Sequence, residues 1–147
     1  MIDKDGNFYK PERGSTAMPD HIFISFCGDA RTEICVFADN DEVYGYCCII
    51  FGNEPAYATI DGAWKTDLPY AVVHRMAFSQ SARGKGLSEA AFALIKDFCV
   101  KQGIFAIRVD TQAENKVMQH ILAREGFAYC GLVTFDGGPK LAYEWNR

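Results

Sequence analysis

Residues 70–98 read YAVVHRMAFSQSARGKGLSEAAFALIKDF, and the hydrophobic period changes once within them, at Leu87. Before that point, the apolar and β-branched residues of Tyr70–Phe78 predict a buried strand. After it, apolar residues recur on one helical face, and Gly103 stands where a C-terminal cap belongs. Between the two lies a small, polar loop with two glycines, Gln80–Gly86. The stretch therefore predicts a strand, a glycine-rich turn and a long helix in succession.

Further strands are predicted before this stretch. Thr32–Phe37 and Val43–Phe51 read as two strands joined by a turn at Asp39-Asn40-Asp41. Residues 22–26 fit either a short strand or one turn of helix. Gly52–Pro69 reads as a loop that is long enough to help shape a site.

After the long helix, the pattern predicts a strand (Ile104–Asp110), a helix (Asn115–Glu125) ended by Gly126, and two strands (Phe127–Phe135 and Lys140–Trp145). The first of these strands alternates Phe105, Ile107 and Val109 against Ala106 and Arg108. The order strand, strand, strand, helix, strand, helix, strand, strand predicts a mixed α/β sheet with a right-handed crossover.

Composition limits the class of protein. The chain has 147 residues, 49% hydrophobic and 23% charged, which suits a single globular domain over 1–147 with an irregular arm over 1–31. The net charge of −4 argues against nucleic acid as a partner. No apolar run reaches the ~20 residues of a membrane-spanning helix. The start lacks a basic region followed by an apolar stretch, so we expect no membrane partner and a cytoplasmic location.

The six cysteines are scattered through apolar stretches and form no C-x-x-C. Because a zinc site needs clustered ligands, we expect no metal site and buried, reduced thiols. The adjacent Cys47 and Cys48 point to opposite faces of their strand with no activating base nearby, and both are interpreted as core residues.

The loop before the long helix has the chemistry of an anion site. The first N–H groups of a helix have no intrahelical acceptor, and glycines let a diphosphate approach the backbone. The alternative is a plain strand-to-helix turn with two solvated cations. Leu87 after Gly86 excludes a Walker loop, which needs Lys-Ser or Lys-Thr there. Glu89 replaces the third small residue of a dinucleotide fingerprint, although Asp110 roughly meets its acidic requirement, so a Rossmann-like nucleotide module stays as a rival.

Two motifs resemble one known family. Arg83-x-x-Gly86-x-Ser88 resembles the coenzyme A loop of the GCN5-related N-acetyltransferases (GNAT), Gln/Arg-x-x-Gly-x-Gly/Ala, with Ser as the last small residue. Asp110 through Asn115 to Gly126-Phe127 resembles the family's second cofactor helix. The resemblance covers roughly residues 42–145. It implies the GNAT-like acyl-CoA N-acyltransferase fold, a mixed, mostly antiparallel central sheet flanked by helices, here with a reduced N-terminal helical region.

The resemblance also implies an acetyl-CoA site. Backbone groups of the strand end would pair with the pantetheine arm and hold the acetyl carbonyl, those of the loop would bind the pyrophosphate, and Asn115 would contact the cofactor. Asn115 also suits a helix N-cap, and both roles can hold. The residues are Met76, Ala77 and Phe78 for the strand end, and Arg83, Gly84, Lys85, Gly86, Leu87 and Ser88 for the loop.

His74 is the candidate general base. It lies mid-strand with Val72 and Met76 on the same face and Arg75 on the other. An imidazole with its ordinary pKa near ~6.5 suits proton removal from an ammonium group. The alternative is a buried structural histidine hydrogen-bonded to a neighbouring strand.

The usual general acid of the family, a Tyr on the second helix, is replaced by Leu122. Tyr129 and Tyr143 are substitutes, although packing within the sheet suits them better, and His120 is interpreted as solvated. Tyr57 and Trp64 in the loop Gly52–Pro69 are candidate acceptor contacts, or they fix the loop in place.

We therefore expect an acetyl-CoA-dependent N-acetyltransferase, an acyltransferase that moves an acetyl group to a primary amine of a small molecule, peptide or protein. Direct attack in a ternary complex is the expected route. The alternative is a catalytically weak or inactive CoA-binding sensor, which Leu122 and the reduced N-terminal region favour. We expect a monomer or a homodimer.

Overall fold

The computed structural model describes residues 23–28, 32–38, 42–80 and 86–147, in which strands and helices follow one another along the chain. The chain falls into two compact units. Unit 1 consists of Met1–Ile50 and Val73–Phe98, and unit 2 consists of Phe51–Val72 and Cys99–Arg147. The mixed α/β class predicted from the order of elements is confirmed.

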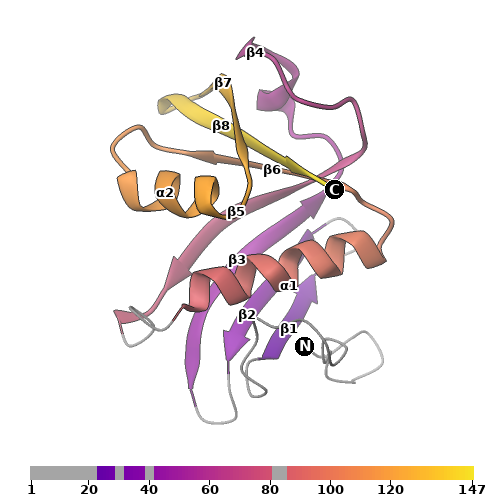
Figure 1. Ribbon diagram of the computed structural model, residues 1–147, viewed down its shortest axis with the longest axis vertical. Helices are drawn as coiled ribbons and strands as arrows, with labels where there is room; N and C mark the ends of the chain where they lie inside the picture. The colour runs from indigo at the N-terminus through magenta and orange to yellow at the C-terminus, as the bar shows by residue number, and fades with distance from the viewer. Residues whose placement is uncertain (1–22, 29–31, 39–41, 81–85) are drawn as a thin grey trace. The chain divides into compact units, whose positions relative to one another are not determined.

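Unit 1 contains three antiparallel strands side by side: β1 (Phe23–Gly28), β2 (Thr32–Ala38) and β3 (Val43–Phe51) (Figure 1). For residues 22–26 the sequence left strand and helix open; residues 23–26 lie in strand β1, and residue 22 lies outside the described residues. The predicted turn at residues 39–41 lies outside the described residues.

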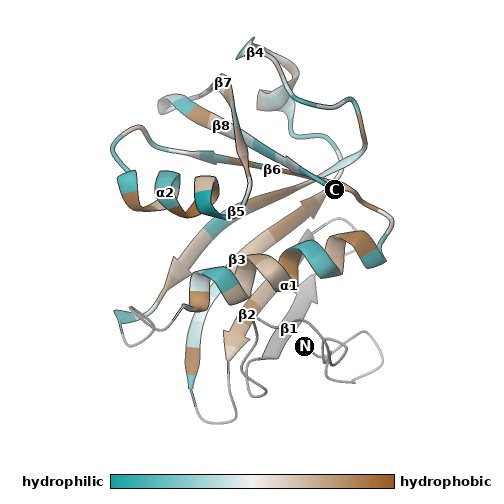
Figure 2. Cartoon of the chain, viewed as in Figure 1, coloured by the Kyte–Doolittle hydropathy of each residue, from teal (hydrophilic) through white to brown (hydrophobic). Residues whose placement is uncertain are grey.

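Strand β5 (Tyr70–Phe78) has the bounds that the sequence predicts and neighbours β3 in unit 1. The N–H of Ser79, just after β5, donates a 2.7 Å hydrogen bond to the carbonyl of Tyr44. Apolar residues run along β3 and the first half of β5 (Figure 2). The second half of β5 is less buried, so this strand offers backbone and side chains for other contacts.

Helix α1 (Leu87–Lys101) follows the predicted apolar pattern. Its predicted face is buried, as are Phe92 and Cys99, so the buried surface is wider than one narrow stripe. The buried members of the predicted face are Leu87, Ala90, Ala91, Leu94, Ile95 and Phe98. This burial anchors the start of the helix, where the glycine-rich loop arrives.

Unit 2 contains β4 (Ile60–Gly62), β6 (Ala106–Thr111), β7 (Ala128–Phe135) and β8 (Gly138–Asn146). The strands pair in the order β6-β8-β7-β4, and every pair among them is antiparallel. The strand pairings described within each unit thus agree with the mostly antiparallel sheet that we expected. Helix α2 (Lys116–Arg124) connects β6 to β7 (Figure 1).

The interpretation of Gly52–Pro69 as a plain loop is wrong in part. It contains a 3-10 helix, η1 (Pro55–Ala58), and the short strand β4. One helical turn and three strand residues are too short to produce a hydrophobic period, so the sequence pattern did not reveal them. Strand β4 approaches β7 so closely that a side chain at Gly62 would collide with the carbonyl of Cys130.

Both α-helices end in the same way. The N–H of Ile104 donates to the carbonyl of Cys99, and the N–H of Phe127 donates to that of Leu122, each at 2.9 Å. The residue before each donor is a glycine with positive φ, Gly103 at 78° and Gly126 at 83°. These are Schellman caps, which glycine favours because it adopts the left-handed conformation without a steric cost. Both predicted helix ends are confirmed.

Strand β6 differs from the one-sided pattern expected for it. Phe105 lies before the strand and is 40% exposed, whereas Arg108 in its middle is only 6% exposed. Ile107 and Val109 are buried as well. Both faces of β6 are therefore covered. A buried arginine needs ion-pair or hydrogen-bond partners on the face of the sheet to which its side chain points.

Candidate active site

The second half of β5 contains an irregular backbone. Arg75 has a φ of 54°, and it is the only residue other than glycine with a positive φ in the part of the chain that the structure describes. A non-glycine residue in this conformation costs of order 1–3 kcal/mol and marks a site where the surrounding structure imposes it. The regular alternation that put His74 and Met76 on one face is interrupted there. His74 is half-buried and Arg75 is exposed.

Strand β3 lies tightly against the end of β5. A side chain at Gly45 would collide with the carbonyl oxygen of Ala77, and its Cβ would lie 2.8 Å from Cδ1 of Phe78. The Phe78 ring in turn stacks on Phe37, with 5.8 Å between ring centroids. Only glycine therefore fits at position 45, a requirement that a lone glycine within a predicted strand signals.

The contact with β3 determines to which edge of β5 the backbone N–H and C=O groups of each residue point. The N–H of Ser79 and the carbonyl of Ala77 face β3. Backbone polar groups of successive residues in an extended strand point to opposite edges. The N–H and C=O groups of Met76 and Phe78 therefore face the edge away from β3. Of the three predicted strand-end residues, these two direct their backbone groups away from β3, whereas Ala77 directs its carbonyl toward β3.

Helix α1 starts at a glycine in the left-handed conformation. Gly86 has a φ of 69°, and among the described residues a Cβ added to it would meet no atom within 4 Å beyond its chain neighbours. Its carbonyl accepts from the N–H of Ala90 at 3.2 Å, which begins the helix. Leu87 is buried and Ser88 is half-buried. The predicted loop residues Arg83, Gly84 and Lys85 lie outside the described residues.

Asn115 is the N-cap of α2, as one of its two predicted roles requires. Its Oδ1 accepts from the N–H of Met118 at 3.1 Å, and its side chain is exposed. On the same helix Leu122 is completely buried and His120 is exposed, so the solvated interpretation of His120 is confirmed. The carbonyl of Leu122 accepts the capping hydrogen bond from the N–H of Phe127, and the side chains of both residues are buried.

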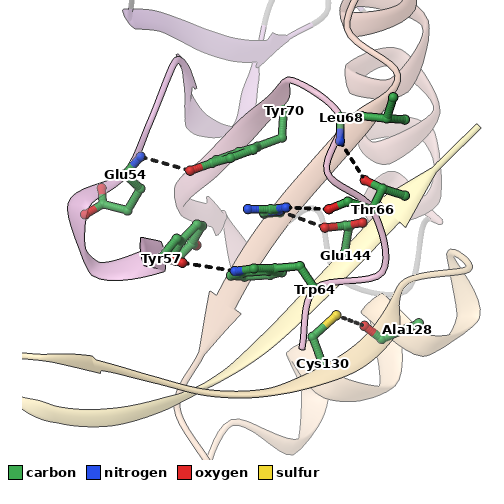
Figure 3. A network of polar contacts seen from close by, with 10 residues as sticks. Glu54, Tyr57, Trp64, Thr66, Leu68, Tyr70, Ala128, Cys130 and Glu144 are labelled. Atoms are coloured by element: carbon green, nitrogen blue, oxygen red, sulfur yellow. Dashed lines mark hydrogen bonds and ion pairs between the residues drawn. The ribbon is translucent and has the colours of Figure 1, made fainter. Parts of the chain in front are cut away.

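Tyr57 and Trp64 are brought together in unit 2, with 4.9 Å between their ring centroids (Figure 3). The indole N–H of Trp64 donates to the carbonyl of Tyr57 at 3.0 Å. The guanidinium carbon of Arg108 lies 4.1 Å from the centroid of the Trp64 ring and 3.9 Å from that of Tyr70. Tyr57 is only 2% exposed and packs on Trp64 within the segment; its role as an acceptor contact stays a prediction.

Two polar bonds complete the environment of Arg108. Its Nε donates to Oε2 of Glu144 at 2.7 Å, and its Nη2 donates to the carbonyl of Thr66 at 2.9 Å. The other carboxylate oxygen of Glu144, Oε1, is buried and has no hydrogen-bond partner among the described residues. Sequence reasoning missed this pair. The sequence held one signal for an ion pair: Arg108 and Glu144 are oppositely charged residues within two predicted strands that are otherwise mostly apolar.

Tyr57 has a second polar partner at the end of β6. Its hydroxyl donates to Oδ2 of Asp110 at 2.7 Å, and Nζ of Lys140 lies 3.3 Å from Oδ1 of the same carboxylate. Burial, followed by the negative charge of Asp110, raises the pKa of Tyr57 above its ordinary value. Tyr57 therefore stays neutral and acts as a hydrogen-bond donor.

The two tyrosines considered as general acids lie opposite each other on β7 and β8. Their ring centroids are 5.7 Å apart in an edge-to-face arrangement. Tyr129 is 51% exposed and Tyr143 is 8% exposed. Burial raises the pKa of Tyr143, which makes it a weaker acid.

Five cysteines are present as thiols in the structure: Cys35, Cys47, Cys48, Cys99 and Cys130. Cys35, Cys47, Cys99 and Cys130 are buried, but Cys48 is half-buried, so the interpretation of Cys48 as a core residue is only partly right. Within the described ranges, no group of three or more His, Cys, Asp or Glu could hold a metal ion. No helix among the described residues is long and apolar enough to span a membrane.

Comparison with solved structures identifies the class of fold. The chain is similar to an acetyltransferase of the GNAT family from Streptococcus agalactiae, with 34% identity and a TM-score of 0.67 over 78% of this chain and 65% of that one. It also resembles a protein from Bacillus halodurans, with 18% identity and a TM-score of 0.66 over 81% and 61% of the two chains. The chain thus spans less than two thirds of the length of these two neighbours.

A third neighbour is the aminoglycoside acetyltransferase AAC(6')-Ib in complex with coenzyme A, with 23% identity and a TM-score of 0.59 over 80% of this chain and 67% of that one. A search of curated proteins found no match. The fold is therefore that of acetyltransferases.

The family model described as the acetyltransferase (GNAT) family matches residues 2–127. The chain belongs to the GNAT family. The match begins well before residue 42, where the resemblance in the sequence started, and so includes the arm and β1–β3.

Proposed function

We propose that this chain is an acetyl-CoA-dependent N-acetyltransferase that acts on a primary amine of a small molecule, peptide or protein. Gly86 is the observation that carries the proposal. It precedes α1 in the left-handed conformation, and none of the described residues beyond its chain neighbours has an atom within 4 Å of where its side chain would be. A diphosphate can approach the backbone N–H groups at such a helix start. Family membership and the coenzyme A complex of a structural neighbour support the same ligand.

Each part of the site has a proposed role. The backbone N–H groups from Arg83 to Ser88 bind the pyrophosphate, with charge from Arg83 and Lys85. The outward backbone groups of Met76 and Phe78 pair with the pantetheine arm and polarise the acetyl carbonyl, while Ala77 is committed to β3. The side-chain amide of Asn115 contacts the cofactor while its Oδ1 caps α2.

Acetyl-CoA supplies the acyl group as an activated thioester. His74 removes the proton from the acceptor ammonium, directly or through water, so that the neutral amine can attack. His74 is half-buried and lies next to the irregular backbone at Arg75, which suits a group that meets both the strand end and solvent. In the ternary complex, positioning of amine and thioester supplies much of the acceleration.

One observation favours the alternative of a CoA-binding sensor. Leu122 is completely buried and apolar at the position of the family's usual tyrosine acid. Neither tyrosine on β7 and β8 is an evident replacement, since Tyr143 has a raised pKa and Tyr129 is half-exposed to solvent. A protein that binds CoA and lacks a proton donor for the thiolate would bind without efficient turnover.

The first experiment compares two glycines of the same helix. Gly86 and Gly103 both have positive φ and open space around the missing side chain, at opposite ends of α1. Gly86→Glu and Gly103→Glu therefore impose similar backbone strain, but only the first places a carboxylate at the proposed pyrophosphate site. Isothermal titration should show that Gly86→Glu weakens CoA binding by about 100-fold or more while Gly103→Glu retains it. Equal affinities would exclude this loop as the site.

The second experiment separates the enzyme from the sensor. The protein is mixed with acetyl-CoA and an alkyl amine, a polyamine, an aminoglycoside or a lysine peptide, and release of free thiol is followed. Acceptor-dependent thiol release supports the enzyme. Tight CoA binding with no release for any amine supports the sensor.

A further inference from the structure

Strands β2 and β3 pair with a shift of one residue next to Gly45. Phe37 of β2 lies opposite Gly45, and the register shifts directly after Phe37, so that Tyr44 is an extra residue on β3. An extra residue of this kind is a β-bulge, which changes the direction of the backbone beside it. The carbonyl of Tyr44 accepts the 2.7 Å hydrogen bond from the N–H of Ser79, the residue after β5. The bulge of β3 thus holds the end of β5.

The ring of Phe78, at the end of β5, takes the space that a side chain at Gly45 would need. A Cβ added at Gly45 would lie 2.8 Å from Cδ1 of this ring and 3.2 Å from the Cα of Phe78. The same ring stacks on Phe37, with 5.8 Å between the ring centroids and 22° between the ring planes. Phe37 is buried. An aromatic ring that covers a glycine of a neighbouring strand helps to fix how the strands lie against each other. The missing side chain of Gly45 therefore makes room for the ring that anchors the end of β5.

The backbone on either side of Phe78 contacts β3 as well. The carbonyl oxygen of Ala77 approaches Gly45 so closely that a Cβ there would collide with it. The N–H of Ser79 is bound to the carbonyl of Tyr44. Three consecutive residues at the end of β5 therefore contact the same short stretch of β3. Because a close-packed interior has little room to absorb an added group, a methyl group at position 45 must displace the end of β5.

We propose that Gly45 is a positioning residue for the thioester end of acetyl-CoA. It fixes the end of β5, so that the backbone groups of Met76 and Phe78 that point away from β3 keep the positions that the pantetheine arm and the acetyl carbonyl require. This inference rests on the proposed acetyltransferase function. Gly45 touches neither reactant and acts only through the residues of β5 that it contacts. All of these residues belong to unit 1.

Two variants of the full chain test this role. Gly45 has no positive φ, so the methyl group of Gly45→Ala acts by its volume alone. Gly137→Ala is the matched control, because Gly137 likewise has no positive φ and a Cβ there would meet no described atom within 4 Å beyond its chain neighbours. Phe37→Leu removes the ring on which Phe78 stacks. Its control is Phe92→Leu, which removes a ring from another buried position of unit 1.

Isothermal titration compares CoA with 3′-phospho-ADP, which keeps the pyrophosphate and lacks the pantetheine arm. We expect the parent to bind CoA roughly tenfold or more tightly than 3′-phospho-ADP, because the arm adds hydrogen bonds to the end of β5. In Gly45→Ala and Phe37→Leu this preference should fall to about threefold or less, and the affinity for 3′-phospho-ADP should stay within about twofold of the parent's.

Steady-state kinetics with the best amine of the panel add a second measurement. In Gly45→Ala kcat should fall roughly 100-fold, because a displacement of about 1 Å at a reacting group has an effect of that size. Both control variants should match the parent in their preference for CoA and in kcat.

The outcomes are distinct. A preference for CoA in Gly45→Ala equal to the parent's, an equal loss of affinity for both ligands, or an unchanged kcat overturns the role of Gly45. If Gly45→Ala does not fold, Phe37→Leu decides by its preference for CoA, compared with Phe92→Leu. A parent that binds the two ligands equally overturns the end of β5 as the site of the arm, and the role of Gly45 with it. A parent that prefers CoA and acetylates no amine overturns the proposed transferase, whereas the affinity ratio still decides the role of Gly45, so the two failures are distinguishable.

Discussion

Nε of Arg108 donates a 2.7 Å hydrogen bond to Oε2 of Glu144, and the two side chains lie almost entirely out of solvent. Each charge has lost its hydration, and the pair compensates the loss only while both members are present. In the part of the chain that the structure describes, Oε1 of Glu144 has no hydrogen-bond partner, so only Oε2 of this carboxylate takes part in the ion pair.

The first prediction follows from this dependence. Glu144→Gln keeps the shape of the side chain and removes its charge, which leaves the Arg108 cation buried and uncompensated. We expect the free energy of unfolding to fall by about 3 kcal/mol. Urea unfolding at neutral pH measures the change, and Arg108→Met/Glu144→Leu should recover most of it. An unchanged urea midpoint for Glu144→Gln would show that the pair is dispensable for stability.

The second prediction concerns the left-handed backbone at Arg75. Arg75→Gly relieves the steric cost of the positive φ but increases the entropy of the unfolded chain, so the free energy of unfolding should change by less than ~1 kcal/mol. Arg75→Val places a β-branched side chain in the same conformation and should lower it by about 2 kcal/mol. Thermal unfolding of the two variants checks this asymmetry. A regular strand at this position would give the reverse order, with valine the better residue.

The third prediction tests His74 as the base. At low pH the acceptor amine is almost entirely protonated, so removal of its proton limits the reaction most; at high pH solvent has already removed it. His74→Ala should therefore lower kcat/KM by roughly 100-fold at the acid end of the pH profile and by less at the alkaline end. CoA affinity should not change. His120→Ala, which removes an exposed histidine, is the control. Parallel profiles for parent and His74→Ala would assign His74 a packing role.

The fourth prediction concerns alkaline pH. Burial and the Asp110 carboxylate raise the pKa of Tyr57 in the folded state. Above the ordinary tyrosine pKa of about 10, the unfolded chain loses this proton while the folded chain keeps it. Stability is therefore complete below about pH 10 and falls as the pH rises further. Unfolding curves between pH 8 and 11 should show a shallower decline for Tyr57→Phe, which has no proton to lose. Equal slopes would contradict the raised pKa.

Much of the fold could be predicted because its main elements are periodic and end at glycines. β3 and β5 have the predicted bounds, and Gly103 and Gly126 end the two helices as expected. The 3-10 helix and β4 were missed because they are too short to produce a period. What holds them, the contacts of Tyr57 and Arg108, involves residues more than forty positions away in the chain.

The residues of the candidate site also fall into two groups: those that local sequence signals predict and those that depend on tertiary contacts. Local signals suffice for Gly86, whose place before an apolar helical face predicts a helix start, and for Asn115, whose residue type predicts a cap. Gly45 matters through its contact with Ala77 on another strand, and no local pattern specifies that partner. The pairing of Arg108 with Glu144 depends on the register of β6 against β8. Register is a tertiary property, so these residues emerged only from the structure.

The segment Gly52–Pro69 is anchored on its inner side, while Asp61, Lys65 and Asp67 point their exposed side chains outward. The residues that hold the segment in place are thus different from those whose side chains are exposed. A combinatorial library that randomises these three codons leaves every internal tether of the segment in place. Substitutions at these three positions therefore change the chemistry of an exposed surface while the contacts that hold the segment beneath it stay unaltered.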